Sequence, residues 1–298
     1  MTQTPMPLAA VQLYGVLIAA AVGVGVWLCV LEEKRLPVPQ DTGYDLALYA
    51  VPPAVVFARL YYVAFTWDAY RDNLLSILYV WEGGLAIYGA VLGGALGVFV
   101  LSRRKRIPLG VLADMTAPSL ILGQAIGRWG NYFNGEAYGY EVIDPRWQFF
   151  PVAVQVDGTW HMATFFYESV WNMAGFAFLY LNRKRFQQKG YGHVFLWYIV
   201  WYGLGRMLIE SLRTDSLMLG SLRVSQLLSV VACAVAQLAM ARRAGGRAAA
   251  LSMLLSVAGV TVFIVDRSGW ALLLSALMMA MSAVALYRLY RLWDVVGE

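Results

Sequence analysis

Long apolar segments separated by short polar stretches run along almost the whole chain. Each segment is close to the roughly 20 residues that a helix needs to cross the hydrocarbon core of a bilayer. The pattern therefore predicts an all-α polytopic membrane protein. The expected membrane-spanning helices lie at residues 11–31, 44–66, 83–101, 114–132, 164–181, 191–210, 222–241, 248–265 and 269–290.

Two of the stretches between these segments have a pattern of their own. Residues 67–82 are amphipathic, and we expect them to lie at the outer membrane interface. Residues 133–163 form the longest connection, in which "AVQVDGTW" alternates between apolar and polar positions. That alternation predicts a short strand or hairpin, and we interpret the connection as a small extracytoplasmic head.

The composition agrees with a membrane protein. Hydrophobic residues make up 60% of the chain and charged residues 14%, against roughly 25% charged residues in ordinary soluble domains. Cys29 and Cys233 lie inside apolar segments, and His161 and His193 are the two histidines, so we expect no disulfide framework and no metal site. The first apolar segment lacks the basic flank and the cleavage motif of a signal peptide.

The positive charges predict an orientation. The stretches "EEKR", "SRRKRIP", "NRKRFQQK", "ARRAGGR" and "YRLYRLW" fall on one side of the predicted spans and hold 15 of the 23 Lys and Arg residues. The positive-inside rule makes this side cytoplasmic, with the N-terminus outside and the C-terminus inside. The net charge of +5 thus indicates orientation in a bilayer, and we expect no nucleic-acid partner.

Three arginines, Arg59, Arg128 and Arg206, fall within or at the end of predicted spans. A charged side chain at mid-bilayer costs about 2.5–3.5 kcal/mol on insertion scales. Each of these arginines is therefore expected either in a structural ion pair or in the wall of a polar cavity.

Arg128 belongs to the stretch "GRWGNYFNGEAYG" at residues 127–139. Asn131 follows it at a spacing of three and so shares its helix face. Asn134 and Glu136 come next, where we expect the helix to end. Arginine binds phosphate through paired hydrogen bonds, and asparagine adds neutral donors. The stretch is therefore a candidate anion site near the outer membrane face.

A second polar stripe lies in "WYGLGRMLIESLRTDS". Tyr202, Arg206, Glu210 and Arg213 have the spacing of one helix face. The stripe is either an internal ladder of ion pairs or the wall of an anionic site. Together with the Arg128 stretch it predicts a cationic pocket open to the outer leaflet, for which an anionic lipid head group is the natural ligand.

Two tyrosines and a set of small residues remain. Gly89 and Gly93, like Ala90 and Gly94, are spaced as in closely packed membrane helices. Tyr88 beside them is a candidate functional residue. Tyr14 in the first span is by itself most typical of an interface anchor.

The residues leave several functions open. The chain contains no HExxH, GxSxG or P-loop motif, which argues against those classes of protease and against an ATP-driven pump. A lipid-modifying transferase fits the pocket. The main alternative is a transporter or flippase of an anionic lipid or solute, and a structural scaffold fits less well because it leaves the polar residues at 128–136 without a role.

At residues 127–139 the sequence resembles the signature of the prolipoprotein diacylglyceryl transferase family, in a Gram-positive-like form. The resemblance covers about residues 10–243. Other landmarks follow in the family's order: "LYG" at 13–15, "ARLYYVAF" at 58–65, "WEGGLAIYGA" at 81–90, "TFFYES" at 164–169, "YGLGRMLIESLRTDSLML" at 202–219 and "LRVSQLLS" at 222–229.

The resemblance implies a reaction and an architecture. Members of the family transfer the diacylglyceryl group of phosphatidylglycerol to the lipobox cysteine in the signal peptide of a preprolipoprotein, without metal or other cofactor, and glycerol phosphate leaves. The fold implied for residues 1–243 is a core of seven membrane helices, with residues 133–163 as the head. Residues 244–298 lie beyond it, and we interpret them as an added packing hairpin with Asp266 and Arg267 at its turn.

The resemblance also implies roles for single residues. The implied catalytic set is Arg128, Asn131, Arg206, Glu210 and Tyr88. Arg128 would hold the lipid phosphate. The implied substrate-binding set adds the residues that shape or line the site, namely Asn134, Glu136, Gly139, Tyr14 and Tyr202.

The sequence departs from the family pattern at two positions. Tyr88 stands where many members carry a histidine proposed as the base, and a phenol with a pKa of about 10 is a poor base for a thiol. We therefore hypothesise that Tyr88 orients substrate. His161 lies one place earlier than the family's second histidine, where Met162 stands, so we assign His161 no catalytic role.

Overall fold

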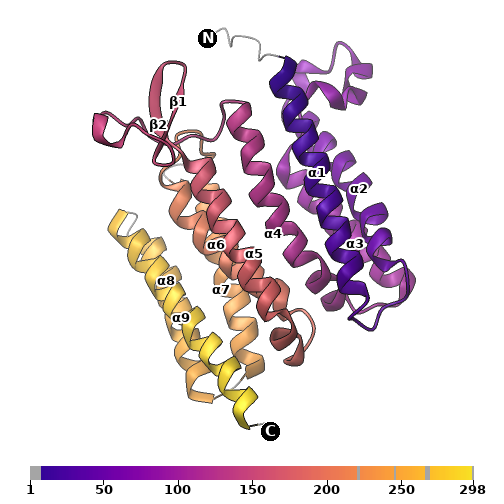
Figure 1. Cartoon of the computed structure of the whole chain (residues 1–298), viewed down its shortest axis with the longest axis vertical. Helices are drawn as coiled ribbons and strands as arrows, with labels where there is room; N and C mark the ends of the chain where they lie inside the picture. The colour runs from indigo at the N-terminus through magenta and orange to yellow at the C-terminus, as the bar shows by residue number, and fades with distance from the viewer. Residues whose placement is uncertain (1–7, 220–221, 245, 266–268, 297–298) are drawn as a thin grey trace. The chain divides into compact units, whose positions relative to one another are not determined.

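A computed structural model describes residues 8–219, 222–244, 246–265 and 269–296. Within these residues a helix lies at every predicted span, so the all-α polytopic fold is confirmed (Figure 1). The helices are α1 (Leu8–Glu33), α2 (Thr42–Phe65), α3 (Ile87–Lys105), α4 (Leu109–Phe133), α5 (Thr164–Gln188), α6 (His193–Glu210), α7 (Val224–Ala244), α8 (Gly246–Val265) and α9 (Gly269–Val296).

Six of the described helices are long and apolar enough to cross a membrane, namely α1, α2, α3, α4, α7 and α9. α5 and α6 have membrane-compatible lengths of 25 and 18 residues but carry buried polar side chains, which lower their apolar content. Buried polar side chains within a membrane bundle mark functional positions more often than packing positions. The two helices with the weaker hydrophobic signal are therefore where a site is expected.

Helix boundaries differ from the predictions where backbone geometry or charge intervenes. α3 begins at Ile87 and not at residue 83, because Gly83 and Gly84 adopt φ values of 91° and 70° that a helix does not tolerate. α5 continues to Gln188, beyond the predicted end at residue 181, through the basic stretch "NRKRFQQ". Apolar length predicts where a span crosses the membrane but not how far its helix projects beyond it.

The chain divides into two compact units, which are described separately. Unit 1 comprises Met1–Gly25 and Ala117–Glu298, and unit 2 comprises Val26–Thr116. In unit 2, α2 and α3 pack so closely that a Cβ added at Gly89, Gly93 or Gly97 would collide with α2. The atoms met are the carbonyl oxygens of Phe57, Pro53 and Tyr49, respectively. The predicted small-residue packing is thus confirmed for Gly89 and Gly93.

Residues 67–82 of unit 2 form short 3₁₀ turns and no continuous helix. The turns are η1 (Trp67–Ala69), η2 (Leu74–Leu78) and η3 (Val80–Glu82). Leu75 and Trp81 remain exposed, which agrees with a segment that contacts lipid or the interface. Arg59 of α2 holds the segment in this shape, because its guanidinium donates to backbone carbonyls within it.

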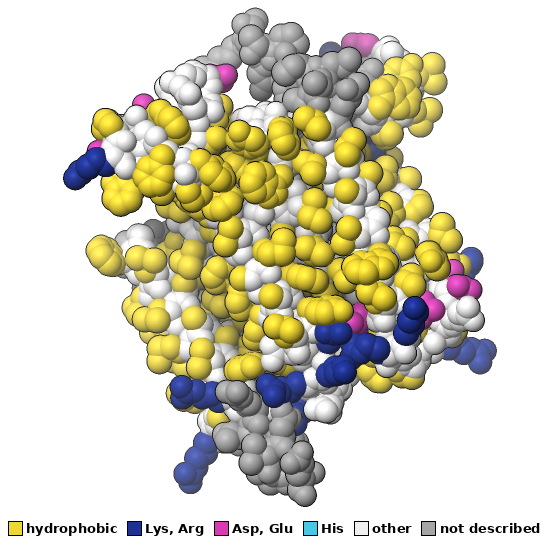
Figure 2. Space-filling model, in the orientation of Figure 1, with side chains coloured by type: hydrophobic (Ala, Val, Ile, Leu, Met, Phe, Trp, Pro, Cys, Tyr) yellow, Lys and Arg dark blue, Asp and Glu magenta, His cyan; other side chains and the backbone are white. Residues whose placement is uncertain are grey.

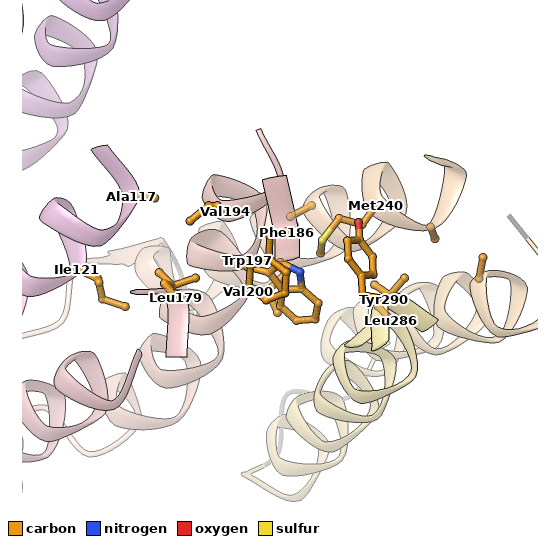
Figure 3. Close-up of a cluster of buried hydrophobic side chains, with 13 residues drawn as sticks. Ala117, Ile121, Leu179, Phe186, Val194, Trp197, Val200, Met240, Leu286 and Tyr290 are labelled. Carbon is orange, nitrogen blue, oxygen red and sulfur yellow. The ribbon is translucent and has the colours of Figure 1, made fainter. Parts of the chain in front are cut away.

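Unit 1 is a helix bundle in which the described residues form two clusters of buried hydrophobic side chains, the larger of which is called the core below. The core joins Phe186 of α5, Trp197 of α6, Met240 of α7 and Tyr290 of α9 (Figure 3). α8 and α9 are bonded to α7 as well: Gln237 Nε2 donates to the Met279 carbonyl at 2.8 Å, and the Ser256 hydroxyl donates to Gln237 Oε1 at 2.6 Å. The added hairpin thus belongs to the bundle of unit 1, which agrees with a packing role; Asp266 and Arg267, placed at its turn by the sequence, lie outside the described residues.

The predicted head hairpin is present. β1 (Ala153–Val156) pairs antiparallel with β2 (Thr159–Met162) across a two-residue turn at Asp157 and Gly158. Both turn residues have positive φ, at 49° and 83°, as tight hairpin turns with an Asp-Gly sequence require. Backbone bonds from Gly139 N to the Met162 carbonyl and from Tyr140 N to the Leu212 carbonyl tie this hairpin to the chain that leaves α6.

Hydrophobic side chains cover the helix surfaces seen in Figure 2. In unit 1, Leu181, Leu254 and Trp270 are 78%, 69% and 82% exposed. Apolar surface on this scale is typical of helices surrounded by lipid. Clustered basic residues stand in the last turn of α3 in unit 2, at Arg103 to Lys105, and of α7 in unit 1, at Arg242 and Arg243.

Candidate active site

A buried carboxylate joins three helices of unit 1. Glu168, near the start of α5, is 2% exposed. Its Oε1 lies 2.7 Å from Nη2 of Arg128 on α4, and its Oε2 lies 3.1 Å from Nη1 of Arg206 on α6. The two arginines of the sequence analysis are thus brought together by one carboxylate, which fixes both guanidinium groups.

The ion pairs continue along α6 and past its end. Arg206 Nη2 lies 2.7 Å from Glu210 Oε2, and Arg213 Nε lies 4.0 Å from the same oxygen. Arg213 also donates to both carboxylate oxygens of Asp215, at 2.9 Å and 2.7 Å. Arg213 reaches Glu210 from the turn after the helix, because α6 ends at Glu210 and not beyond it.

We call this chain of alternating charges the ladder: Arg128, Glu168, Arg206, Glu210, Arg213 and Asp215. The sequence left open whether the α6 stripe was an ion-pair ladder or the wall of an anionic site. The ladder is present, and its exposure pattern is compatible with the second interpretation too. The side chains of Arg128 and Arg206 are 18% and 15% exposed, against 3% and 2% for Glu168 and Glu210.

This difference in exposure decides the charge that a ligand meets. The carboxylates lie on the inner side of the ladder, and the edges of the guanidinium groups reach its accessible side. A guanidinium has five N–H donors, so an arginine bound to one carboxylate keeps donors for an anion. The predicted cationic pocket is therefore better described as a cationic edge on an internally neutralised network.

The polar stretch after Arg128 folds back on itself at the end of α4. Arg128 Nη1 donates to Asn131 Oδ1 at 3.3 Å, and Asn131 Nδ2 donates to Glu136 Oε2 at 3.4 Å. Asn134 Nδ2 reaches Glu136 Oε1 at 3.5 Å. Gly135, with φ of 62°, provides the left-handed residue that ends the helix and allows this reversal. The four polar residues predicted from the sequence are thus neighbours in the fold.

Tyr14 lies beside this cluster. A Cβ added at Gly130 of α4 would collide with the Tyr14 ring, so the glycine makes room for the aromatic side chain. The placement supports the expectation that Tyr14 lines the site.

Packing alone explains why residue 139 is a glycine. A Cβ there would lie 2.7 Å from the Leu212 carbonyl and 2.8 Å from Met162 Cβ. Its role in substrate binding stays a prediction.

Tyr202 lies one helical turn before Arg206 on α6, within electrostatic reach of Glu168, Arg206 and Arg128. Its ring stacks on that of Tyr198 at 6.0 Å. This placement agrees with the predicted part of Tyr202 in the site.

Tyr88 and Arg59 belong to unit 2. Tyr88 lies in the first turn of α3 with its ring 6.2 Å from that of Tyr61, and its part in the site stays a prediction. Arg59 is 5% exposed. Its guanidinium donates to a cage of backbone carbonyls that belong to Ser76, Ile77, Tyr79, Gly83 and Gly84.

His161 is held within the head. Its Nε2 lies 2.8 Å from the Thr159 hydroxyl, and its Nδ1 lies 3.2 Å from the Gly139 carbonyl. These bonds stabilise the hairpin and agree with the absence of a catalytic assignment.

Sequence reasoning missed Glu168. The signal was present, since Glu168 is the acidic residue inside the apolar segment 164–181, and an acid there needs a cationic partner. Spacing within one helix cannot reveal such a pair, because Arg128 and Arg206 lie on other helices. The segment "TFFYES" was used only as a mark of the family resemblance, and its glutamate was assigned no role.

Fold and site together define a class: a multi-pass membrane protein with a buried arginine–carboxylate network that presents a cationic edge. Comparisons with known proteins narrow this class. The family model described as prolipoprotein diacylglyceryl transferase matches residues 4–242. The chain belongs to the prolipoprotein diacylglyceryl transferase family.

Three relatives illustrate how much of the chain is shared. Each is named phosphatidylglycerol–prolipoprotein diacylglyceryl transferase. The protein of Ligilactobacillus salivarius is 44% identical over 229 residues, which is 74% of this chain and 84% of that protein. The protein of Bacillus cytotoxicus is 44% identical over 73% of this chain and 82% of its own length. The protein of Listeria monocytogenes is 43% identical over 74% and 81%.

Proposed function

We propose that this protein transfers the diacylglyceryl group of phosphatidylglycerol to the thiol of a lipobox cysteine in the signal peptide of a preprolipoprotein. The observation that carries the proposal is the pair of arginines held by Glu168. Family membership and the names of the relatives support the donor lipid and the class of acceptor protein.

The chemistry explains why such a pair is useful. The cysteine sulfur attacks the glycerol carbon that bears the phosphate, a C–S bond forms, and the C–O bond to the phosphate breaks. The electron pair leaves on the phosphate oxygen, and the thiol proton is taken up by the released glycerol phosphate or by water. A phosphodiester with one negative charge thus becomes a monoester that gains charge as the bond breaks.

Fixed guanidinium groups stabilise this change more than they stabilise the bound lipid. Arg128 and Arg206 are positioned by Glu168 and Glu210 before the substrate arrives, so they need no reorganisation as charge develops. An interaction that strengthens in the transition state raises the rate and not only the affinity. The same cationic edge favours the thiolate, the nucleophilic form of a thiol whose ordinary pKa is about 8.5.

The remaining residues have supporting roles in this proposal. Asn131, Asn134 and Glu136 shape the head-group site, Tyr14 and Tyr202 line it, and Tyr88 orients substrate. The basic helix ends lie on the cytoplasmic side, which directs the N-terminus outward and the C-terminus inward. The reaction then takes place at the outer face of the bacterial cytoplasmic membrane.

A product assay tests the proposal. Detergent-solubilised protein is mixed with phosphatidylglycerol and a fluorescent lipobox peptide, and the peptide mass and released glycerol phosphate are measured. We expect a diacylglyceryl mass gain with wild type and none with a Cys-to-Ser peptide. Arg128→Ala should lower the rate at least about 100-fold, as expected for removal of a charged transition-state contact.

Arg146→Ala is the matched control, because Arg146 lies in the head, bonded to Asp144 and 84% exposed. It should retain the wild-type rate. If folded wild type binds the lipid and yields no thioether, the proposal is wrong. Movement of the lipid between leaflets of a vesicle without modification of the peptide would instead identify a transporter.

A further inference from the structure

One buried amide in unit 1 has no partner among the described residues. Asn172 of α5 is 0% exposed, and neither its Nδ2 nor its Oδ1 has a hydrogen-bond partner there. A buried polar group left without a bond destabilises a fold, so such a group requires an explanation. The explanation lies in its position one helical turn from Glu168.

The face on which Asn172 lies is fixed by its neighbours along α5. Glu168 contacts Arg128 and Arg206, and Gly175 lies so close to the α4 and α6 side chains Ile121 and Trp201 that a Cβ would collide with both. Residues at spacings of four and three share a stripe of a helix. Asn172, between Glu168 and Gly175, therefore faces α4 and α6 as well.

The two facing helices carry polar residues that contact each other. Gln124 lies four residues before Arg128 on α4, and Tyr198 lies four residues before Tyr202 on α6. Gln124 Nε2 donates to the Tyr198 hydroxyl at 2.9 Å, and Gln124 Oε1 is buried without a partner among the described residues. We call Gln124, Asn172 and Tyr198 the second tier.

The second tier offers neutral donors. The Tyr198 hydroxyl accepts from Gln124, so its own proton remains for another acceptor, and the Asn172 amide has two N–H donors. Neutral donors in a buried position suit uncharged acceptors, since an anion there would keep its desolvation cost. The ligand expected at this tier is a carbonyl oxygen.

Geometry connects this ligand to the donor lipid. One turn of helix advances about 5.4 Å along the axis, so Asn172 and Gln124 lie about that far along their helices from Glu168 and Arg128. Tyr198, eight residues before Arg206 on α6, joins them through its hydrogen bond with Gln124. In a glycerophospholipid the acyl ester groups follow the phosphate within a few covalent bonds. A lipid whose phosphate meets Arg128 and Arg206 would therefore bring its ester carbonyls to Asn172 and Tyr198.

We propose that the second tier binds the acyl ester carbonyls of the donor lipid and so selects diacyl lipids over lipids that lack these carbonyls. The proposal rests on the proposed function, because it extends the same lipid site toward the acyl chains. It assigns Asn172 and Tyr198 a binding role and no part in the chemistry.

The test compares phosphatidylglycerol with its dialkyl ether analogue, which has the same head group and no carbonyl. Loss of one hydrogen bond to a buried donor corresponds to about a tenfold change. We expect wild type to show a kcat/KM for the ester lipid about tenfold above that for the ether lipid. Asn172→Leu should lower use of the ester lipid and leave the ether lipid unaffected, so that the ratio falls, with any remaining preference owed to Tyr198.

Asn182→Leu is the control on the same helix. Asn182 donates to the Phe178 carbonyl at 2.8 Å and accepts from Tyr287 at 3.1 Å, away from the ladder. It should preserve the ratio. Tyr198→Phe removes the hydroxyl proton and provides a second variant that should lower the ratio in the same way if Asn172→Leu does not fold.

A stability measurement gives an independent readout. Without lipid, Asn172→Leu should melt no lower than wild type, because it removes a buried amide without a partner. The ester lipid should raise the melting temperature of wild type more than the ether lipid does, and this difference should be smaller in Asn172→Leu. A wild-type preference for ester lipid that Asn172→Leu leaves unchanged overturns the proposal, as does equal use and equal stabilisation by both lipids.

Failure of the transferase reaction and failure of ester recognition give different results. If wild type forms no thioether with the ester lipid, the proposed transferase reaction is wrong, and the melting temperatures still decide whether the second tier recognises ester carbonyls. If thioether forms from both lipids at the same rate, the reaction stands and the second tier does not select the donor.

Discussion

Glu168 is the residue on which the arrangement of the two arginines depends. It lies between Arg128 and Arg206 and is itself almost fully buried, so each guanidinium has a fixed partner. Removal of one member of a buried ion pair is far more costly than loss of an exposed one, because the remaining charge stays desolvated. Glu168 therefore sets both the position of the cationic edge and its net charge.

Glu168→Gln tests this dependence. The side chain keeps its shape but loses its charge, and one of its two atoms changes from acceptor to donor and faces a guanidinium. We expect transferase activity to fall at least about 100-fold and stability to fall by about 3 kcal/mol, as for a broken buried pair. Activity is measured by the product assay and stability by thermal unfolding in detergent.

Glu141→Gln is the control, since Glu141 is an exposed carboxylate in the head. It should leave both quantities unchanged. Wild-type activity in Glu168→Gln would show that the arginines are positioned without this bridge.

At the end of the ladder that lies beyond α6, Asp215 gives the protein a pH-dependent contact. Burial opposes ionisation of Asp215, but the hydrogen bonds and charge of Arg213 outweigh burial, and the pKa of the carboxyl is lowered. A lowered folded pKa contributes stability above the unfolded pKa of about 3.9, and this stability is lost as pH falls through the folded value.

Asp215→Asn should therefore melt slightly below wild type between pH 5 and 8, and the difference should close as pH falls below about 4. The Asp215 side chain is 48% exposed, so the effect is small, at most about 1 kcal/mol after solvent screening. Melting temperatures of both proteins across this pH range provide the measurement. A difference that persists undiminished at pH 3 would contradict the assignment.

What the sequence could predict at this scale follows from the range of each signal. Tyr202, Arg206 and Glu210 were placed on one face because helix periodicity is local. The same reasoning does not place Glu168 or Asn172 in the site. Both face α4 and α6, and the periodicity of one helix says nothing about which other helices lie beside it. Asn172 indicates a binding position because it is buried and has no hydrogen-bond partner among the described residues, and an asparagine in the sequence does not show this.

At the scale of elements, apolar length predicts each of the long helices in the described residues. The conformation of the segment between α2 and α3 depends instead on how its backbone carbonyls are bonded. Five carbonyls between residues 76 and 84 accept hydrogen bonds from Arg59. Buried carbonyls need a partner, and a long side chain from α2 can supply it. No sequence pattern specifies those bonds, and so an amphipathic stretch becomes a series of 3₁₀ turns.

The contact between α2 and α3 yields a prediction with an internal control. Gly93 faces the Pro53 carbonyl, and a methyl group there would collide with backbone that cannot rotate away. Gly93→Ala should destabilise the protein by about 1–3 kcal/mol, the usual cost of overpacking. Gly94, one residue on, meets Ala54 Cβ at 3.8 Å, an ordinary contact distance, so Gly94→Ala should be tolerated.

Thermal unfolding of the two variants in the same detergent distinguishes them. Because the substitutions are identical and adjacent, any general loss of flexibility from replacing glycine is common to both. Equal melting temperatures for Gly93→Ala and Gly94→Ala would mean that α2 and α3 can separate without cost.

At the scale of the whole molecule, residues beyond the matched region are part of unit 1. The family match ends at residue 242, yet Leu286 and Tyr290 of α9 lie in the same core as Phe186 and Trp197. The sequence predicted the hairpin and its packing role, but not the buried bonds from Gln237 to the Met279 carbonyl and to Ser256. Those bonds make α7 dependent on the hairpin, because an amide facing lipid alone is costly.

Removal of the hairpin should therefore lower stability without removing chemistry. A chain that ends at residue 244 exposes Gln237 to lipid and opens the core around Trp197, whereas the ladder lies on α4, α5 and α6 and keeps its partners.

Leu286→Ala in the full chain should by itself cost about 2–5 kcal/mol as a cavity in a packed core. Gln237→Leu should partly restore the melting temperature of the shortened chain and not raise that of the full chain. Thermal unfolding and activity per folded molecule, measured together, separate a packing role of α8 and α9 from a role in the reaction. A shortened protein that melts like wild type but makes no thioether would show that the two helices act in the reaction.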